Sequence, residues 1–202
     1  GIEVGYLTEA SSRHKILFDF AGLLGQQASN EKSGHTDSFL VSKSGKLLME
    51  CYYRRGRLNY PHYQMSITKS HTALALGRAM QLGYLKMEDL DKPVHQLIDG
   101  LMVEDFAKGA TTISLHDALR MCSGIRMPKD RILNAAKKGS MNGRAHAQAL
   151  FSLSDPINNL SKQYKYQSAD NILVMQVIDS VVPGGAEKFI REELFGPMGI
   201  DF

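Results

Sequence analysis

The apolar residues of this chain follow a helical period over most of its length and a strand-like pattern in one early segment. From Arg13 to about Gln27 they recur every three or four positions, which predicts an amphipathic helix that can cover a sheet. Two β-prone runs follow, Ser38 to Ser42 and Lys46 to Arg54, on either side of Ser44-Gly45. A glycine-containing pair between two such runs is typical of a tight turn, so we expect an antiparallel hairpin.

Helical spacing returns after the hairpin and dominates the rest of the chain. The strongest run extends from Ser66 to Leu82, and Gly83 is placed to end it. Ser114 precedes the run Leu115 to Met121 as a candidate N-cap, and Ser123-Gly124 follows that run. Further helical runs cover residues 145–153, 170–178 and 186–194.

These elements predict an α+β fold in which an antiparallel sheet is flanked by helices and joined to a mainly helical domain. We expect residues 1–65 to form the amino-terminal part of the α/β domain and residues 66–185 to form the helical domain. Residues 186–202 are expected to form a helix that returns to the α/β domain.

Composition narrows the possible functions. Hydrophobic residues make up 43% of the chain and charged residues 22%, as in ordinary globular proteins, and the net charge is only +3. Scattered basic residues give no reason to expect a nucleic-acid partner, and no apolar stretch approaches the roughly 18 residues of a membrane span. The histidines lack metal-ligand spacing, so we expect neither a metal nor another cofactor.

Two cysteines, Cys51 and Cys122, are too few for a zinc knuckle, and the sequence leaves open whether they form a disulfide. The cellular compartment also stays open, with a periplasmic or secreted location slightly favoured over a cytoplasmic one. The candidate chemistry of the chain lies in its serine, lysine and tyrosine residues.

The tetrapeptide Ser66-Ile67-Thr68-Lys69 places a hydroxyl and an amine three positions apart, where a helix brings them to one face. Ser-x-x-Lys occurs three times, but Ser12/Lys15 lies in a polar stretch and Ser29/Lys32 lies in a segment that we interpret as a loop. Only the Ser66 copy opens a strongly periodic apolar run. A serine in the first turn has free backbone N–H groups and the positive end of the helix dipole nearby, which suits a nucleophile. The alternative is that Ser66 only caps the helix and Lys69 is solvated.

Four segments in order resemble the penicillin-recognising serine hydrolases, the class C β-lactamase-like proteins. Within this family they are especially similar to the branch of 6-aminohexanoate-dimer hydrolases and related esterases. The first is the Ser66-x-x-Lys69 segment, and the second is the Met-x-Ser-Gly turn at Met121 to Gly124. The third, Tyr166-Gln167-Ser168, takes the place of the family's Tyr-x-Asn or Tyr-x-Ser motif. The fourth, Leu194 to Ile200, is similar to its "Leu-Phe-x-Pro-Leu-Gly-Met" segment.

The resemblance implies a serine hydrolase that forms an acyl-enzyme on Ser66. Lys69 and Tyr166 would be its acid–base pair, because a free serine hydroxyl is a poor nucleophile and a phenol needs a nearby positive charge to act as a base. Ser168 would orient the substrate or bond to Lys69. His62 and Tyr63, shortly before the nucleophile, are candidates for lining the mouth of the substrate pocket, although a solvated or backbone-bonded histidine and a partly buried tyrosine are more common.

The family's third motif, Lys-Thr-Gly or a relative of it, follows the tyrosine by a long interval and supplies the second oxyanion donor. Lys43-Ser44-Gly45 has similar letters but lies at the predicted hairpin turn, before the nucleophile, so we interpret it as a turn. We therefore expect this chain to be an amino-terminal portion whose sheet is incomplete. The missing C-terminal part of the same protein would be a partner, and the activity of this segment alone stays open.

The leading interpretation is hydrolysis of an ester or a small amide. The first alternative is a β-lactam or D-alanyl-peptide hydrolase, and the second is a non-catalytic binding module that has kept the fold. Reaction with a serine-directed probe would separate the enzymes from the binding module.

Overall fold

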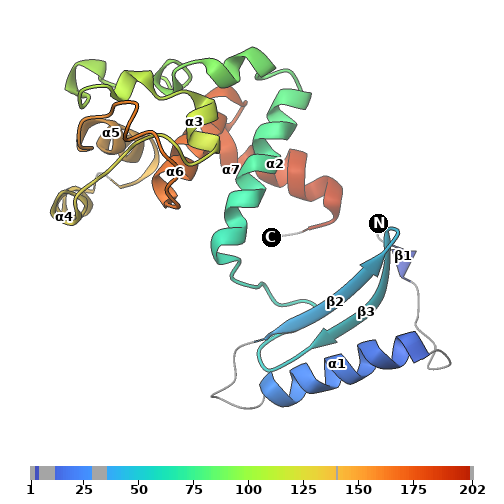
Figure 1. Cartoon of the computed structure of the whole chain (residues 1–202). Helices are drawn as coiled ribbons and strands as arrows, with labels where there is room; N and C mark the ends of the chain where they lie inside the picture. The colour runs from blue at the N-terminus through green and yellow to red at the C-terminus, as the bar shows by residue number, and fades with distance from the viewer. Residues whose placement is uncertain (1–2, 5–11, 29–35, 140, 201–202) are drawn as a thin grey trace. The chain divides into compact units, whose positions relative to one another are not determined.

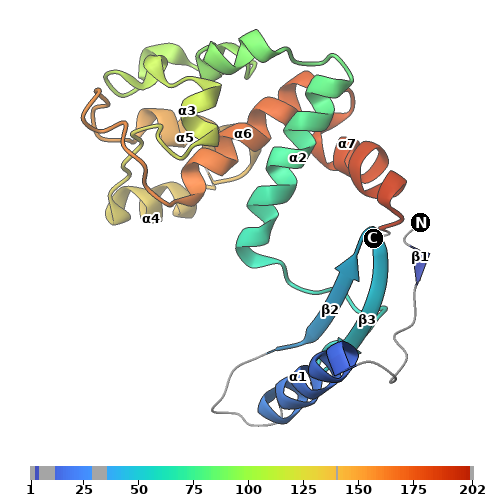
Figure 2. The ribbon, with the colours of Figure 1, turned by 45° about the vertical axis from the view of Figure 1, so that its right-hand side comes forward.

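The computed structural model describes residues 3–4, 12–28, 36–139 and 141–200. The chain divides into two compact units, Gly1–Gln64 and Met65–Phe202. Figure 1 shows the elements of each unit, and Figure 2 shows the same ribbons turned by 45°. Each unit is described here by itself.

The first unit consists of a helix on a small sheet. Helix α1 (Ser12–Ala28) runs along strands β2 (Ser38–Lys43) and β3 (Lys46–Tyr52), which pair as the predicted antiparallel hairpin. Strand β1 (Glu3–Val4), which we did not predict, pairs in parallel with β3 and gives the order β1-β3-β2. Helix and hairpin meet where the Phe20 and Phe39 rings stand edge to face at 5.3 Å.

The turn of this hairpin explains why its sequence signal was reliable. Ser44 and Gly45 both adopt left-handed backbone angles, with φ of 51° and 76°. Two consecutive residues of this kind give a turn whose twist matches that of the strands, and glycine adopts the conformation without a steric penalty. Lys43-Ser44-Gly45 is therefore a hairpin turn, as predicted.

The second unit is helical. Its long helices are α2 (Thr68–Gln81) and α6 (Ser168–Val181), which lie side by side with α3 (Leu115–Leu119) in both views. The others are α4 (Lys129–Lys137), α5 (Gly143–Ser152) and α7 (Gly185–Phe189). A π-helical turn, Ile190–Phe195, continues α7, and the short 3-10 turns are Met65–Ile67, Met87–Asp91, Val94–Gln96, Val103–Asp105, Ala110–Thr112 and Gly196–Met198.

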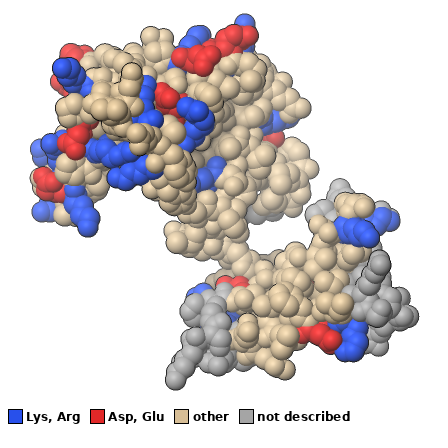
Figure 3. All heavy atoms as spheres, viewed as in Figure 1, with Lys and Arg blue, Asp and Glu red and all other residues tan. Residues whose placement is uncertain are grey.

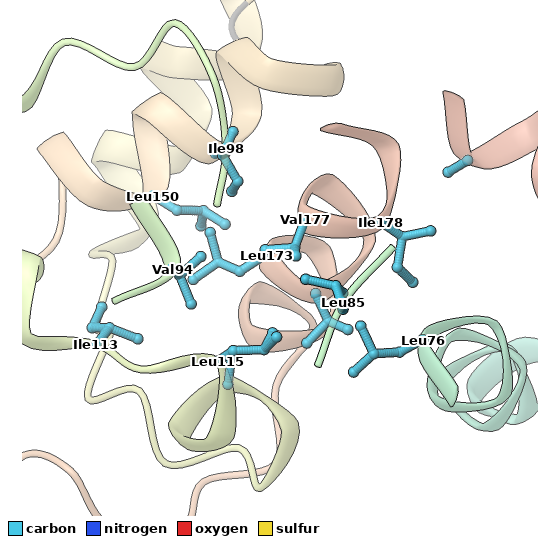
Figure 4. Close-up of a cluster of buried hydrophobic side chains, with 14 of the residues drawn as sticks. Leu76, Leu85, Val94, Ile98, Ile113, Leu115, Leu150, Leu173, Val177 and Ile178 are labelled. Carbon is cyan, nitrogen blue, oxygen red and sulfur yellow. The ribbon is translucent and has the colours of Figure 1, made fainter. Parts of the chain in front are cut away.

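The core of this unit forms between these helices (Figure 4). Side chains from five segments converge there and are almost fully buried, among them Leu76, Val94, Leu115, Leu150 and Leu173. Removing a side chain of this size from water contributes roughly 1.5–3 kcal/mol each. A packed core of this kind holds the first turn of α2 and the start of α6 in fixed relative positions, and these two helix ends carry the candidate site.

Several predicted helices are confirmed with shifted ends, and one helix was not predicted. Ser114 caps α3 as predicted, because its hydroxyl accepts the Asp117 N–H at 3.0 Å and the Asp117 carboxylate accepts the Ser114 N–H at 3.1 Å. The helix expected from Arg13 to about Gln27 is α1, which begins one residue earlier, at Ser12. Helix α4 was not predicted, because its segment is mostly polar and its apolar positions are few.

Residues 186–200 pack within the second unit. Ala186 and Phe189 belong to its buried core, and the Arg78 guanidinium bonds to the Glu193 carboxylate at 2.8 Å. A return of this segment to the first unit stays a prediction.

Candidate active site

The Ser66 hydroxyl and the Lys69 amine meet at the start of α2. Ser66 lies in the 3-10 turn Met65–Ile67 that leads into the helix, and the Lys69 Nζ lies 3.4 Å from the Ser66 Oγ. Ile67, at the N-cap position, makes no side-chain cap, so Ser66 is not the capping residue that the simpler interpretation required. The contact joins the two groups that the tetrapeptide was predicted to bring together.

The other two Ser-x-x-Lys copies behave differently. The Lys15 amine bonds instead to the Asp19 carboxylate one turn later, at 2.8 Å. Ser29 and Lys32 lie outside the described residues.

Tyr166 reaches the same place from the segment before α6. The Lys69 Nζ lies 5.1 Å from the centroid of the Tyr166 ring. A hydrogen bond with Ser66 is the largest cause that lowers the pKa of the Tyr166 phenol below its ordinary value. Desolvation opposes it, and the positive charge of Lys69 together with a hydrogen bond to Lys69 lowers the pKa further. The phenol is 57% exposed, so its ionised form is partly solvated. Hydroxyl, amine and phenol thus converge from segments about a hundred positions apart in sequence.

A buried carboxylate anchors the segment that carries Tyr166. Asp170, with no exposed surface, accepts the Ser123 N–H at 3.1 Å and the Gln167 side-chain amide at 2.5 Å. The Gln167 amide also donates to the Ile125 carbonyl at 3.2 Å. Asp170 therefore ties the Ser123-Gly124 turn to the residue that directly follows Tyr166.

The residue before Tyr166 is fixed as well. The Lys165 N–H donates to the carbonyl of Met121 at 2.9 Å. Met121 has a φ of 56°, and Met65, just before Ser66, has a φ of 49°. Left-handed backbone angles cost energy for residues with bulky side chains and persist only where the surroundings impose them. The backbone is therefore strained at Met65, beside Ser66, and at Met121, beside the Tyr166 segment.

Sequence reasoning missed Gln167, Asp170 and Met121. The available signal was an acidic residue inside an otherwise apolar helical run, which in a core must be hydrogen-bonded.

A small cavity of about 230 Å³ adjoins the Lys69 side chain, between α2, α3 and α6. Thr72 lines it with its hydroxyl bonded to the Asn171 amide at 3.2 Å.

The remaining candidates are Ser168, His62 and Tyr63. Ser168 is the exposed first residue of α6, and its side chain makes no hydrogen bond to Lys69 within the described residues. His62 and Tyr63 belong to the first unit, and Tyr63 is 89% exposed. The roles predicted for these three residues stay predictions. Cys51 and Cys122 are both free thiols.

No group of three metal-ligating side chains occurs among the residues described. Likewise, no helix in the described ranges is long and apolar enough to cross a bilayer.

The Beta-lactamase family model matches residues 26–201. The chain belongs to the Beta-lactamase family. Its fold is β-lactamase-like and helix-rich with a small open sheet, as predicted, and the family's members are serine hydrolases. No curated protein matches this chain.

Several solved structures share the fold of this family member. FmtA from Staphylococcus aureus matches 96% of the chain at 17% identity and a TM-score of 0.63. An octameric penicillin-binding protein homologue from Pyrococcus abyssi matches 94% at 18% identity and a TM-score of 0.55. A D-stereospecific amidohydrolase from Streptomyces sp. matches 66% at 20% identity and a TM-score of 0.50. The chain covers 52%, 43% and 41% of these proteins, about half their length.

Proposed function

We propose that this chain carries the acylation machinery of a serine hydrolase that forms an acyl-enzyme on Ser66 and acts on an ester or a small amide. The 3.4 Å contact between the Ser66 Oγ and the Lys69 Nζ, beside a tyrosine whose pKa both groups lower, supports this proposal most strongly. A serine hydroxyl becomes an effective nucleophile only when an adjacent base can take its proton.

Tyr166 is the base in this proposal. As its phenolate it accepts the Ser66 hydroxyl proton while the Ser66 oxygen bonds to the substrate carbonyl carbon. The Lys69 ammonium stabilises the phenolate before the transfer, because the two charges attract at short range. The resulting neutral Tyr166 then gives the proton to the leaving oxygen or nitrogen as the tetrahedral intermediate collapses.

Deacylation uses the same groups in the reverse order. Tyr166, again a phenolate, takes a proton from water while the water oxygen attacks the acyl carbon. Tyr166 then gives this proton to the Ser66 oxygen as the acid product leaves. Positioned proton transfer of this kind typically contributes ~10²–10⁴-fold to the rate.

The negative charge on the carbonyl oxygen requires fixed donors. The Ser66 backbone N–H, at the start of α2, is our proposal for the first donor. We further propose that the second donor, together with the remaining sheet strands, comes from a C-terminal part of the same protein outside this segment. The chain's coverage of only about half of the similar structures supports this division.

The amide option gains support from the shared fold of the D-stereospecific amidohydrolase, and a β-lactam or D-alanyl-peptide substrate gains support from the penicillin-binding protein homologue. Turnover of a short-chain p-nitrophenyl ester, a small anilide and a chromogenic cephalosporin by the intact protein compares the three classes directly. Hydrolysis of the ester or anilide with an inert cephalosporin supports the leading proposal, and the converse supports the alternative.

The test of the mechanism is covalent labelling of the intact protein with a fluorophosphonate, followed by peptide mass mapping. We expect an adduct on Ser66 that Ser66→Ala abolishes and that the matched control Ser70→Ala, one residue after Lys69, leaves in place. Failure of fluorophosphonate and penicillin probes alike to label Ser66 would leave the non-catalytic binding module as the better interpretation.

A further inference from the structure

A second and larger cavity, of about 780 Å³, lies in the helical unit between α4, α5 and the turn at residues 100–105. It shares no lining residue with the smaller cavity beside Lys69. Its volume falls within the ~300–1,000 Å³ range of sites for drug-sized molecules. The cavity is therefore large enough for a small organic ligand.

The walls of this cavity are preformed. The Gln148 side chain on α5 bonds to both backbone groups of Met102, accepting its N–H at 2.8 Å and donating to its carbonyl at 3.0 Å. The same amide donates to the Ser152 hydroxyl at 2.8 Å. These bonds attach the turn to α5, so a ligand would not have to order this wall.

The lining combines an apolar floor with a cationic rim. The buried Ala135 on α4 and Ala149 on α5 both line the cavity, and small side chains at these positions leave the space open. Arg131, Lys138 and Arg144 supply positive charge, and Asp105 is the acidic residue of the lining. Lysine and arginine side chains gather over α4 and α5 in Figure 3.

Two of these three cations form no ion pair with any residue that the structure describes. Arg131 is already bonded to the Asp155 carboxylate at 3.2 Å and to the Leu153 carbonyl at 2.9 Å. Lys138 and Arg144 form no ion pair within the described part of the chain; Lys138 follows the last residue of α4, and Arg144 lies in the first turn of α5. Two uncompensated cations in the lining of one cavity favour an anion there.

The Arg144 guanidinium lies close to the backbone of the turn at Gly100. A Cβ on Gly100 would lie 3.1 Å from its Nη1, and Gly100 has a φ of 71°. Glycine at this position therefore leaves the guanidinium room to lie against the backbone. An arginine held in this way presents a planar pair of donors that matches a carboxylate.

We infer that this cavity is a binding site for a small amphipathic anion, whose carboxylate lies between Lys138 and Arg144 and whose apolar body rests on Ala135 and Ala149. The anionic group satisfies the unpaired cations, and the apolar body of the ligand leaves water for the apolar floor of the cavity. This site is separate from the Ser66 site, and its existence does not depend on the proposed catalytic function.

The test uses 4-phenylbutyrate as the probe and its neutral amide, 4-phenylbutyramide, as the matched ligand, titrated into the ¹⁵N-labelled chain with amide shifts as the readout. We expect saturable shifts at Gln148 and Ala149 and binding of the carboxylate at least about tenfold (~1.4 kcal/mol) tighter than that of the amide, since hydrogen bonds to a charged group are stronger than those to a neutral one. Acetate alone tests whether the charge suffices without the apolar body, and we expect no saturation with it.

Variants separate the site from general positive charge. Arg144→Gln and Lys138→Gln should each weaken binding of 4-phenylbutyrate by about fivefold or more, whereas Lys137→Gln, which removes a neighbouring charge outside the lining, should change it less than twofold. All three residues are exposed, so the variants should keep the fold, and shifts of core amides verify this. Equal binding of acid and amide, equal effects of the three variants, shifts that map elsewhere, or no saturation by 4-phenylbutyrate would each overturn the inference.

Discussion

Replacing Asp170 tests whether the buried carboxylate holds Tyr166 in its place. Asp170→Ala removes both acceptor oxygens and leaves the Ser123 N–H without a partner, in a region where Ser123 itself is fully buried. An unsatisfied buried donor costs ~1–3 kcal/mol, and the lost bond from Gln167 to a charged acceptor adds a similar amount. We expect the free energy of unfolding to fall by about 2–5 kcal/mol.

Asp170→Asn is the milder change and keeps the protein folded for the decisive measurement. Its amide oxygen still accepts the Ser123 N–H, but its amide nitrogen faces the nitrogen of Gln167. The Gln167 amide must then rotate, and the Ile125 carbonyl loses its donor. We expect a loss of about 1–2 kcal/mol from this single rearranged bond.

The informative readout is the ionisation of Tyr166, followed by ultraviolet titration and compared with Tyr166→Phe to isolate its signal. In the parent chain its pKa lies below the ordinary tyrosine value because of Ser66 and Lys69. Both effects need short distances, so loosening the segment in Asp170→Asn should raise the Tyr166 pKa toward the ordinary value of ~10.

Asp179→Asn is the matched control. Asp179 also lies on α6 and its carboxylate accepts the Ala186 N–H at 2.7 Å, but this bond holds the start of α7 rather than the Tyr166 segment. We expect it to leave the Tyr166 pKa unchanged. An unaltered Tyr166 pKa in Asp170→Asn, together with the expected loss of stability, would show that Asp170 only supports the core and would refute the positioning role.

Two further predictions concern the base and the backbone. Fluorophosphonate labelling of the intact protein should accelerate as pH rises through the lowered pKa of Tyr166, because the phenolate is the base, and Lys69→Met should move this rise to higher pH, as measured by labelling rates over a pH series. Gly109→Ala should destabilise the chain by ~2 kcal/mol or more in urea unfolding, since its Cβ would lie 2.0 Å from the Ile157 carbonyl oxygen. Gly139→Ala, with a similar φ and open space around it, should cost only ~1 kcal/mol, and equal losses in the two variants would contradict the clash.

The hairpin and the main helices could be predicted because local sequence determines them. Ser44-Gly45 suits a left-handed turn between β-prone runs, and the helical run after Ser66 has a regular apolar face ended by Gly83, whose φ is 83°. In α3, Ser114 and its partner three residues later form a reciprocal cap that is visible in the sequence. Each of these signals acts within a few residues.

The features that escaped prediction depend on contacts between distant segments. Asp170 is one acidic residue in an apolar run, and its partner Ser123 lies 47 positions away. Helix α4 has few apolar positions, and of its residues Ala135 is the one that is buried. The left-handed backbone angle of Met65 could not be predicted, because such angles are usually marked in a sequence by glycine and this position is a methionine.

The candidate site itself was predicted only in part. The Ser66–Lys69 contact follows from helical spacing, whereas the choice of Tyr166 rested on resemblance to the family. In the structure the Lys69 Nζ lies 5.1 Å from the centroid of the Tyr166 ring. The N–H of the neighbouring residue, Lys165, donates to the carbonyl of Met121, which follows α3.

The most direct test of the account is the site of covalent modification in the intact protein after reaction with a fluorophosphonate. The account predicts a single adduct on Ser66, formed more slowly by about 10²-fold or more in Tyr166→Phe, because this variant keeps the ring but loses the base. A modified residue other than Ser66, or labelling of Ser66 at the same rate in Tyr166→Phe, would contradict the central claim that hydroxyl, amine and phenol act together.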